Sequence, residues 1–389
     1  MHILIIPSER YLPPESHLEG IFQRDQGMAL TRRGHRLGVI VPHLHPLRTL
    51  RTAKNIRQRG LEVEKIDDIA VYRYNNWLWI PRIKLGYIWL WLRVGKTLWK
   101  KYIIDNGKPD LIHAHNALYA GYLASIIKRK YDIPYVLTEH SSDHALGKVS
   151  NYQVPLAKMA YQEAKARIVV SPKLGEDLEA RYKDAFTPWE WVPNILDSIF
   201  EKEVILGNQS RQADRPFIFL SIGNLTENKG FSDLIKAFAQ KFKHQPRYQL
   251  RIGGEGITRN QLVELAQQLG IEQQVSFLGL LSRPQVLEEM LACDVFVLAS
   301  HYESFGVVLI EALACGKPVV ATACGGPECI VKAKNGYLVP PGDVAALGEA
   351  METVVRKIDS FNPVSIREEC LSLFGTKVIA EKLTNIYSS

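Results

Sequence analysis

The sequence predicts an α/β protein made of two parallel-sheet domains. The chain has 389 residues, which is too long for a single hydrophobic core. Short apolar, β-rich runs alternate with helical patterns, and buried strands separated by helices indicate parallel sheets. Because this alternation occurs in both halves of the chain, we expect two Rossmann-like domains facing each other across a cleft.

The expected strands each end at Pro, Gly or a polar residue. They are HILIIP, RLGVIVP, PDLIHAH, PYVLTEH and ARIVVSP in the first half, and PFIFLSIG, YQLRIGGEG, VSFLG, DVFVLAS and PVVAT in the second. The polar, aperiodic segment 198–215 is the expected boundary. It places one domain at 1–200 and the other at 201–371. A final helix is expected to be capped by Thr376, with Ile379, Leu383 and Ile386 on one face.

Composition indicates an ordinary globular protein, with 46% hydrophobic and 23% charged residues. The opening MHILIIP is too short for a signal peptide, and no apolar run approaches the roughly 18 residues of a membrane-spanning helix. The five cysteines show no CxxC spacing and are interpreted as reduced, packing thiols. These features predict a cytoplasmic protein.

The charge is uneven along the chain. Residues 1–200 hold 29 Lys and Arg against 20 Asp and Glu, a balance of +9, while the remaining residues hold 19 against 21, a balance of −2. The first half is therefore expected to face an anionic lipid surface, a phosphate-bearing substrate, or both. Nucleic acid is not expected, because no recognition motif accompanies the charge.

A tryptophan-rich segment at 77–103 carries five of the seven tryptophans. Arg93, Lys96 and Lys100 fall on one stripe of its expected helix, and Trp89 and Trp99 fall on another face. Trp together with Lys and Arg on an amphipathic helix suits the inner face of an anionic membrane. Packing against the first domain's sheet is the alternative. A second basic stripe is expected at Arg48, Arg51, Lys54 and Arg57.

Ligands of open parallel sheets bind beyond the carboxyl ends of the strands, so the loops there carry the candidate site. Lys229 and Gly230 stand at the expected start of a helix, where a cation and free N–H groups suit a phosphate. A solvated lysine before a helix is an equally good alternative. Gly253–Gly256 is a glycine-rich turn that lets backbone approach a ligand, but it lacks the GxGxxG fingerprint.

The stretch ESFGVVLIE places Glu303 and Glu311 eight residues apart around an apolar run. At ~1.5 Å per helical residue the two acids would be roughly 12 Å apart, about the length of a ribose, two phosphates and the start of a sugar. A buried helix with acids at its edges is the alternative. However, an unpaired carboxylate at Glu311 would be costly among apolar neighbours, and ligand hydroxyls are suitable partners.

In its motifs the chain resembles glycosyltransferase family 4, retaining sugar-nucleotide transferases of GT-B fold. The resemblance covers nearly the whole chain and is closest in the second half. The matching segments there are SIGNLTENKGFSDLIKAF, RIGGEG, VSFLG, ESFGVVLIEALACGKPVVAT, GGPECIV and NGYLVPPGD. Looser matches in the first half include GIFQRDQGMALTRRGHRLGVIVP, DLIHAHNALYAGYLA and YVLTEHSS. The resemblance also implies that the C-terminal helix, 372–389, crosses back to complete the first domain.

The resemblance implies a role for each matched residue. Glu311 would hold the ribose hydroxyls, Glu303 would face the donor sugar, and Lys229 would neutralise the diphosphate. In the first domain, His140 would touch the sugar near the reacting centre, so Glu303, Lys229 and His140 are the expected catalytic residues. Further donor contacts would come from Gly20, Asn224, Gly254, Phe277, Leu278, Ser304, Phe305, Gly306 and Val307, with Phe277 and Leu278 near the base.

Two positions depart from the family pattern. Asn224 stands where the family often has Arg, which leaves more of the diphosphate charge to Lys229, with Arg24 as a candidate to compensate. Glu19-Gly20 stands where the family usually has Gly-Gly, which weakens the expected approach of this loop to the donor.

No metal site is predicted. In the pairs His43-x-His45 and His113-x-His115 the two rings are expected to point to opposite faces of their strands. Helix N-termini and Lys229 would instead stabilise the leaving diphosphate.

The expected function is retaining, metal-independent transfer of a hexosyl or N-acetylhexosaminyl group. The donor would be a nucleoside-diphosphate sugar, with UDP favoured slightly over GDP, and no other cofactor is expected. The acceptor would be a carbohydrate or lipid-linked hydroxyl in cell-surface polysaccharide or glycolipid synthesis. A sugar-nucleotide epimerase, a phosphorylase and a non-catalytic sugar-nucleotide or membrane-binding protein are the alternatives.

Overall fold

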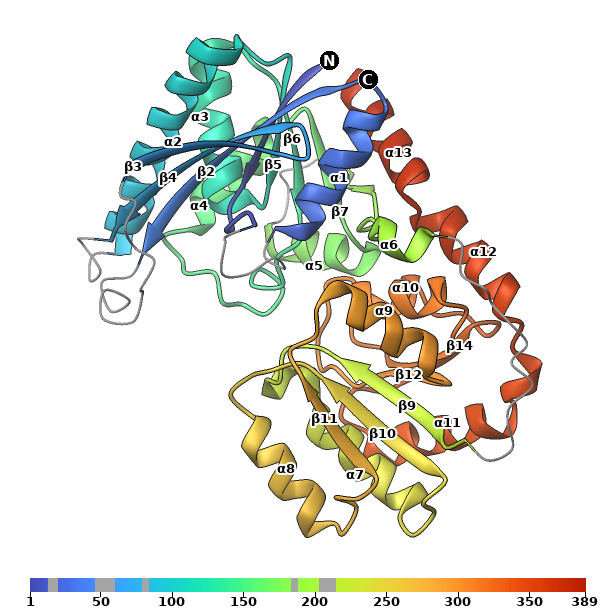
Figure 1. Ribbon diagram of the computed structural model, residues 1–389. Helices are drawn as coiled ribbons and strands as arrows, with labels where there is room; N and C mark the ends of the chain where they lie inside the picture. Colours follow the sequence, from blue (N-terminus) through green and yellow to red (C-terminus); the bar gives the residue numbers. More distant parts are fainter. Residues whose placement is uncertain (13–19, 46–59, 79–83, 183–187, 203–214) are drawn as a thin grey trace. The chain divides into compact units, whose positions relative to one another are not determined.

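The computed structural model describes residues 1–12, 20–45, 60–78, 84–182, 188–202 and 215–389 (Figure 1). The chain divides into two compact units. The first comprises Met1–Val170, Gly175–Val192 and Ile379–Ser389, and the second comprises Ser171–Leu174 and Pro193–Val378. The division therefore falls a few residues before the expected boundary segment. Within that segment Ser198–Glu201 form a short helix, α6, and residues 203–214 lie outside the described residues.

The first unit is built on one sheet with the strand order β3-β4-β2-β1-β5-β6-β7-β8. The strands are β1 (His2–Pro7), β2 (Arg36–His45), β3 (Gly60–Ile66), β4 (Ile69–Trp77), β5 (Leu111–His115), β6 (Tyr135–Glu139), β7 (Ala166–Val169) and β8 (Glu190–Trp191). Neighbouring strands are parallel except at the β3 edge, where β3 and β4 are antiparallel.

The β3–β4 hairpin was not predicted from the sequence. Its turn residues Asp67 and Asp68 have positive φ values of 48° and 70°, a conformation that Asp tolerates better than most residues. Every second residue of β3 is exposed, which is the burial pattern of an edge strand with one wet face.

The helices of the first unit flank this sheet (Figure 1). They are α1 (Ile21–Arg32), α2 (Lys84–Asn106), α3 (Tyr122–Tyr131), α4 (Val154–Glu163), α5 (Pro172–Tyr182) and the C-terminal α13 (Thr376–Ser388), with a π-helical turn, η2 (Ala117–Gly121). From Ile379 onward α13 belongs to this unit. The Tyr387 hydroxyl lies 2.7 Å from His113 Nδ1 on β5, and Lys165 Nζ donates to the Tyr387 carbonyl oxygen over 3.1 Å.

The long helix α2 has a buried face and a wet face. Trp91, Trp99 and Tyr102 are buried, so these aromatic residues form core. Trp89 is 55% exposed and shares the wet face with Arg93, Lys96 and Lys100. Trp89 and Trp99 therefore do not share a face as expected. The second predicted basic stripe, residues 48–57, lies outside the described residues.

The second unit has a fully parallel sheet in the order β11-β10-β9-β12-β13-β14. Its strands are β9 (Phe217–Ile222), β10 (Tyr248–Gly253), β11 (Val275–Gly279), β12 (Val295–Leu298), β13 (Val319–Thr322) and β14 (Gly336–Val339). Its helices are α6, α7 (Phe231–Phe242), α8 (Arg259–Gln268), α9 (Arg283–Ala292), α10 (Val307–Ala314), α11 (Val344–Arg356) and α12 (Pro363–Phe374), with short turns η3 (Glu227–Lys229), η4 (Pro327–Cys329) and η5 (Ile358–Ser360).

Two further findings concern the helices and the cysteines of the described residues. None of their helices is long and apolar enough to cross a membrane. All five cysteines are free, and burial raises the pKa of the Cys293, Cys315, Cys324 and Cys329 thiols to about 12. These thiols are therefore protonated packing groups at neutral pH.

Candidate functional site

The candidate residues of the second unit gather at the carboxyl ends of four neighbouring strands. Asn224 follows β9, Gly254 follows β10, Phe277 and Leu278 lie at the end of β11, and the segment 303–307 follows β12. Because these strands are adjacent and parallel in the order β11-β10-β9-β12, their carboxyl ends meet along one edge of the sheet. This edge is where open parallel sheets bind ligands.

Lys229 and Glu303 form a partly buried ion pair at this edge. Lys229 Nζ lies 2.6 Å from Glu303 Oε1, and the Ser300 hydroxyl donates to the same oxygen over 2.7 Å. The side chains of Lys229 and Glu303 are 29% and 12% exposed. An ammonium has three N–H donors and Glu303 takes one, so Lys229 keeps donors for a ligand. Lys229 and Glu303, which were both expected to act on the sugar-nucleotide donor, are therefore brought together.

The backbone around Lys229 is fixed against the end of β12. Gly230 has φ +65°, and a Cβ on this residue would lie 1.9 Å from the Ala299 carbonyl oxygen. The His301 N–H donates to the Asn228 carbonyl over 2.8 Å, and the Asn228 side-chain amide donates to the Tyr302 carbonyl over 3.1 Å. Gly230 is thus required for the loop bearing Lys229 to approach the loop bearing Glu303.

The stretch from Glu303 to Glu311 is not a single helix. Glu303 forms an isolated parallel bridge with Gly325, and α10 begins only at Val307, after Gly306 with φ +100°. The helical rise of ~1.5 Å per residue therefore applies only to Val307–Glu311, and the separation of roughly 12 Å expected between the two acids does not follow from it. The first N–H groups of an α-helix lack acceptors four residues back, and in α10 that of Leu309 donates instead to the Gly306 carbonyl over 3.0 Å. Phe305 is buried against Phe374, so its contribution to a ligand site is limited to its backbone.

Glu311 is a buried carboxylate, 3% exposed, and only one of its oxygens has a hydrogen-bond partner among the residues that the structure describes. Arg283 Nη2 on α9 donates to Oε1 over 2.7 Å, while Oε2 has no hydrogen-bond partner among the described residues. Burial raises the pKa of Glu311, and the Arg283 guanidinium opposes that rise. Glu311 was expected to need a partner, and Arg283 provides a hydrogen bond to one of its two oxygens.

Arg283 was missed in the sequence. The available signal was its place at the first position of α9, directly after the N-cap Ser282 and before Pro284. A cation at a helix N-terminus is unfavourable with respect to the helix dipole, so such an arginine needs compensating carboxylates.

The glycine-rich turn after β10 has a structural requirement of its own. A Cβ on Gly254, whose φ is +131°, would lie 1.9 Å from the Gly223 carbonyl oxygen. A Cβ on Gly256 would lie 2.2 Å from the Leu225 carbonyl oxygen. These glycines therefore allow the backbone of this turn to pack closely against the loop after β9, which carries Asn224.

In the first unit, His140 stands directly after β6. Its Nε2 lies 2.9 Å from His115 Nδ1 and the two rings are stacked at an interplanar angle of 19°. Its backbone N–H donates to Asn116 Oδ1 over 3.0 Å. Burial lowers the pKa of His115 well below its ordinary value, so the ring beside His140 is neutral. The imidazole of His140 is thus positioned by both a ring and a backbone contact.

The expectation for the two histidine pairs was wrong. The rings of His113 and His115 are 4.2 Å apart between centroids, and those of His43 and His45 are 4.0 Å apart. Side chains alternate along a strand with a period of two, so residues i and i+2 lie on the same face. The described residues nevertheless contain no group of three or more His, Cys, Asp or Glu that could hold a metal ion.

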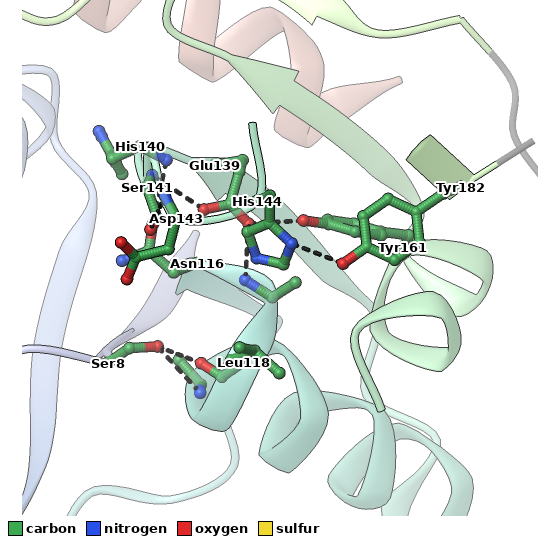
Figure 2. A network of polar contacts seen from close by, with 12 residues as sticks. Ser8, Asn116, Leu118, Glu139, His140, Ser141, Asp143, His144, Tyr161 and Tyr182 are labelled. Atoms are coloured by element: carbon green, nitrogen blue, oxygen red, sulfur yellow. Dashed lines mark hydrogen bonds and ion pairs between the residues drawn. The ribbon is translucent and has the colours of Figure 1, made fainter. Parts of the chain in front are cut away.

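A buried carboxylate that was not predicted, Glu139, organises the loop bearing His140 (Figure 2). Its Oε1 accepts from the Ser141 N–H over 3.0 Å, and its Oε2 accepts from the Ala117 N–H over 3.0 Å and the Tyr161 hydroxyl over 2.8 Å. His144 Nε2 lies 3.7 Å from Oε2. Glu139 therefore ties the end of β6 to the loop after β5. The sequence signal was an acid at the end of an otherwise apolar strand.

Gly20 precedes α1 with φ +77°, and a Cβ there would lie 2.8 Å from Tyr11 Cα. Its backbone is therefore restricted to glycine by local contacts. Arg24, the candidate to compensate for Asn224, has its Nε 2.7 Å from Asp67 Oδ2 within the first unit.

Two protein-family models match the chain. The model for glycosyl transferases group 1 matches residues 206–360, and the model for Glycosyltransferase Family 4 matches residues 23–198. Together they cover most of the sequence. The chain therefore belongs to the glycosyltransferases that these two models describe.

Among curated relatives of this glycosyltransferase, the glycogen synthase of Mycobacterium tuberculosis is 27% identical over 271 residues, 68% of this chain. The aligned part spans 64% of that relative's length. The N-acetyl-alpha-D-glucosaminyl L-malate synthase of Bacillus anthracis is 25% identical over 377 residues, covering 95% of this chain and 93% of that protein.

The solved structure of Anabaena Alr3699/HepE in complex with UDP aligns over 100% of both chains. Its TM-score is 0.72 and its sequence identity 22%. The fold is GT-B, as the motifs of the sequence predicted.

Proposed function

We propose that this glycosyltransferase moves a sugar from a nucleoside-diphosphate sugar to an acceptor hydroxyl with retention of anomeric configuration. The observation that carries the proposal is the pairing of Lys229 with Glu303 at the ligand-binding edge of one parallel sheet, together with a buried oxygen of Glu311 that has no partner in the described part of the chain. A cation, two carboxylates and the start of a helix provide groups for a diphosphate and for the hydroxyls on either side of it.

Each part of the donor has a proposed contact in the second unit. Glu311 Oε2 accepts from the ribose hydroxyls. Lys229 and the backbone N–H groups of Phe305, Gly306 and Val307 bind the diphosphate. Glu303 accepts from the sugar hydroxyls, since both of its hydrogen bonds to Lys229 and Ser300 use Oε1. The half-exposed Phe277 and Leu278 at the end of β11 contact the base.

UDP is the proposed nucleotide, and a hexosyl or N-acetylhexosaminyl group is the proposed cargo. Two comparisons support this choice. The Anabaena protein was solved in complex with UDP, and the Bacillus anthracis relative is named for an N-acetylglucosaminyl product.

The proposed chemistry is departure of the diphosphate followed by attack of the acceptor on the same face of the sugar. Negative charge develops on the leaving oxygen, and the Lys229 ammonium and the N-terminus of α10 stabilise it without a metal ion. His140, held by His115 and Asn116 in the first unit, keeps its proposed role of contacting the sugar near the reacting carbon.

The acceptor is proposed to be carbohydrate or lipid-linked, in cell-surface polysaccharide or glycolipid synthesis at the inner face of the membrane. Support comes from the wet face of α2, where Trp89, Arg93, Lys96 and Lys100 are exposed and Arg93 lies over the Trp89 ring at 5.4 Å. An exposed Trp beside a row of cations suits an anionic lipid surface. Flotation with anionic vesicles at low salt tests this contact; no binding, or equal binding to neutral vesicles, would overturn it.

A calorimetric screen of UDP-, GDP- and ADP-sugars, followed by transfer assays with membrane extract, tests the function. We expect saturable binding of one donor, slow hydrolysis without acceptor, and a product with the donor's anomeric configuration by NMR, unaffected by EDTA. An altered sugar nucleotide without acceptor would indicate an epimerase. Phosphate-dependent sugar release would indicate a phosphorylase. Binding without any hydrolysis or transfer would indicate a non-catalytic protein.

A further inference from the structure

Arg283 lies between two carboxylates in the second unit. Its Nη2 donates to Glu311 Oε1 over 2.7 Å, and its Nε donates to Asp197 Oδ2 over 2.9 Å. The guanidinium is also stacked over the Phe200 ring, with Cζ 5.0 Å from the ring centroid. The Arg283 side chain is 22% exposed and that of Asp197 is 13% exposed. The planar guanidinium of Arg283 is therefore fixed in one orientation by two carboxylates at its edges and a ring against its face.

The other end of Glu311 is different. Oε2 is buried and accepts no hydrogen bond from any described residue. A buried carboxylate oxygen without a donor is unfavourable, so it marks a position where a ligand donor is expected. Arg283 fills one side of this carboxylate and leaves the second oxygen available.

The charged and titratable groups around Glu311 come from several elements. Arg283 is on α9 and Asp197 precedes α6. From α12, the Cys370 thiol donates to the Ile310 carbonyl, and Arg367 donates to the Ala314 carbonyl. Cys315 follows the end of α10 itself, and β12 and β13, VFVL and VVAT, contribute no charge. Of these groups, Arg283 and Asp197 are the ones that act on the ionisation of Glu311.

We propose that Arg283 is a positioning residue of the donor site. Its hydrogen bond to Oε1 orients the Glu311 carboxylate, favours the ionised form and presents Oε2 to the ribose hydroxyls. This inference rests on the proposed function, because it takes Glu311 as the ribose acceptor. Arg283 itself acts through Glu311 and does not contact the donor.

The electrostatic consequence has a definite sign. Burial raises the pKa of Glu311 and Arg283 lowers it, so removing Arg283 raises that pKa further. A protonated Glu311 is a poorer hydrogen-bond acceptor than the carboxylate. Without Arg283, donor affinity therefore increases with pH through the raised pKa. With Arg283 present, affinity is expected to vary much less.

The test is calorimetric binding of the nucleoside diphosphate, UDP, GDP or ADP, that the wild-type protein binds, at several pH values between about 6 and 9. Arg283→Met is expected to weaken binding about tenfold or more at the low end, with partial recovery at the high end. Arg283→Lys retains the charge and is expected to be intermediate. Arg251→Met is the matched control, because Arg251 on β10 is also paired with an acid, Glu289, at 3.0 Å.

The double variant Arg283→Met/Glu311→Gln makes the test specific. If Arg283 acts through Glu311, the double variant binds like Glu311→Gln alone, and both lose the pH dependence. Its melting temperature is expected to exceed that of Arg283→Met, because no unpaired charge remains at position 311. This comparison keeps the test valid even if Arg283→Met is less stable.

Two results would overturn the inference. One is wild-type affinity with an unchanged pH profile in Arg283→Met. The other is additive losses in the double variant, which would mean that Arg283 acts on the donor or the fold independently of Glu311. A wild-type protein that binds none of the three nucleoside diphosphates would instead refute the proposed function, so the two failures are distinguishable.

Discussion

Replacing Lys229 by alanine removes the ammonium that lies 2.6 Å from Glu303. At an effective dielectric constant of ~20, a unit charge about 4 Å from a phosphate oxygen contributes roughly 4 kcal/mol of attraction. About half a unit of new charge develops on the leaving group, which adds roughly 2 kcal/mol of attraction in the transition state alone. We therefore expect kcat to fall about 30-fold and kcat/KM about 10⁴-fold, because kcat/KM also loses the ground-state attraction.

The folded state should change much less. The Lys229–Glu303 pair is partly exposed, and Glu303 keeps its hydrogen bond from Ser300. A loss of about 1 kcal/mol or less in the free energy of unfolding is expected.

The measurement is steady-state transfer kinetics with urea unfolding of the same samples. Lys241→Ala is the control. Lys241 is also ion-paired, to Glu349 and Glu352, but it lies near the C-terminal end of α7 and is not one of the candidate site residues. This variant should leave kcat and KM unchanged. Turnover of Lys229→Ala within twofold of wild type would refute the assignment of Lys229 to the diphosphate.

Three further outcomes are expected. Gly230→Ala should destabilise more than Gly342→Ala in urea unfolding: both glycines have positive φ, but a Cβ at 230 meets a carbonyl oxygen at 1.9 Å and a Cβ at 342 meets nothing within 4 Å. We expect about 1 kcal/mol for Gly342→Ala and clearly more for Gly230→Ala; equal losses would contradict the close approach. Glu139→Ala should cost about 3 kcal/mol, because it leaves the buried Ala117 N–H and the partly buried Ser141 N–H without this acceptor, and a loss below about 1 kcal/mol would argue against its organising role. Burial lowers the pKa of His113 to about 3, so its stabilising contribution is complete above the unfolded pKa of ~6.5 and is lost as the pH falls toward 3. Between about pH 6 and 4 the unfolding free energy should fall less steeply in His113→Gln, by up to ~1.4 kcal/mol per pH unit, and identical slopes would be inconsistent with a buried neutral imidazole.

Much of the fold could be predicted because parallel strands buried on both faces leave continuous apolar runs in the sequence. All ten expected strands are present. The strands that were missed are at or near sheet edges. Two of them, β3 and β4, form a hairpin whose alternating pattern was obscured by charged residues, and β8 has only two residues.

The candidate donor site was predictable as a set of loops but not as contacts. Lys229 and Glu303 are 74 positions apart, and their pairing depends on the adjacency of β9 and β12 in the sheet. The partners of Glu311 and His140, which are Arg283 and His115, come from other elements and have no local sequence signature. The misjudged faces of the histidine pairs were a different kind of error, since the period of a strand was sufficient to place them.

The sequence by itself determined the family, the GT-B fold and the loops that carry the candidate chemistry, because these depend on apolar periodicity, glycine placement and motif order. Only the tertiary structure decided that Glu303 is bound by Lys229 and Ser300, that Glu311 has one satisfied and one open oxygen, and that most described aromatic residues of α2 are core. The physical reason is that pairing and burial are properties of elements brought together by the sheet order, and a linear pattern does not specify which side chains meet.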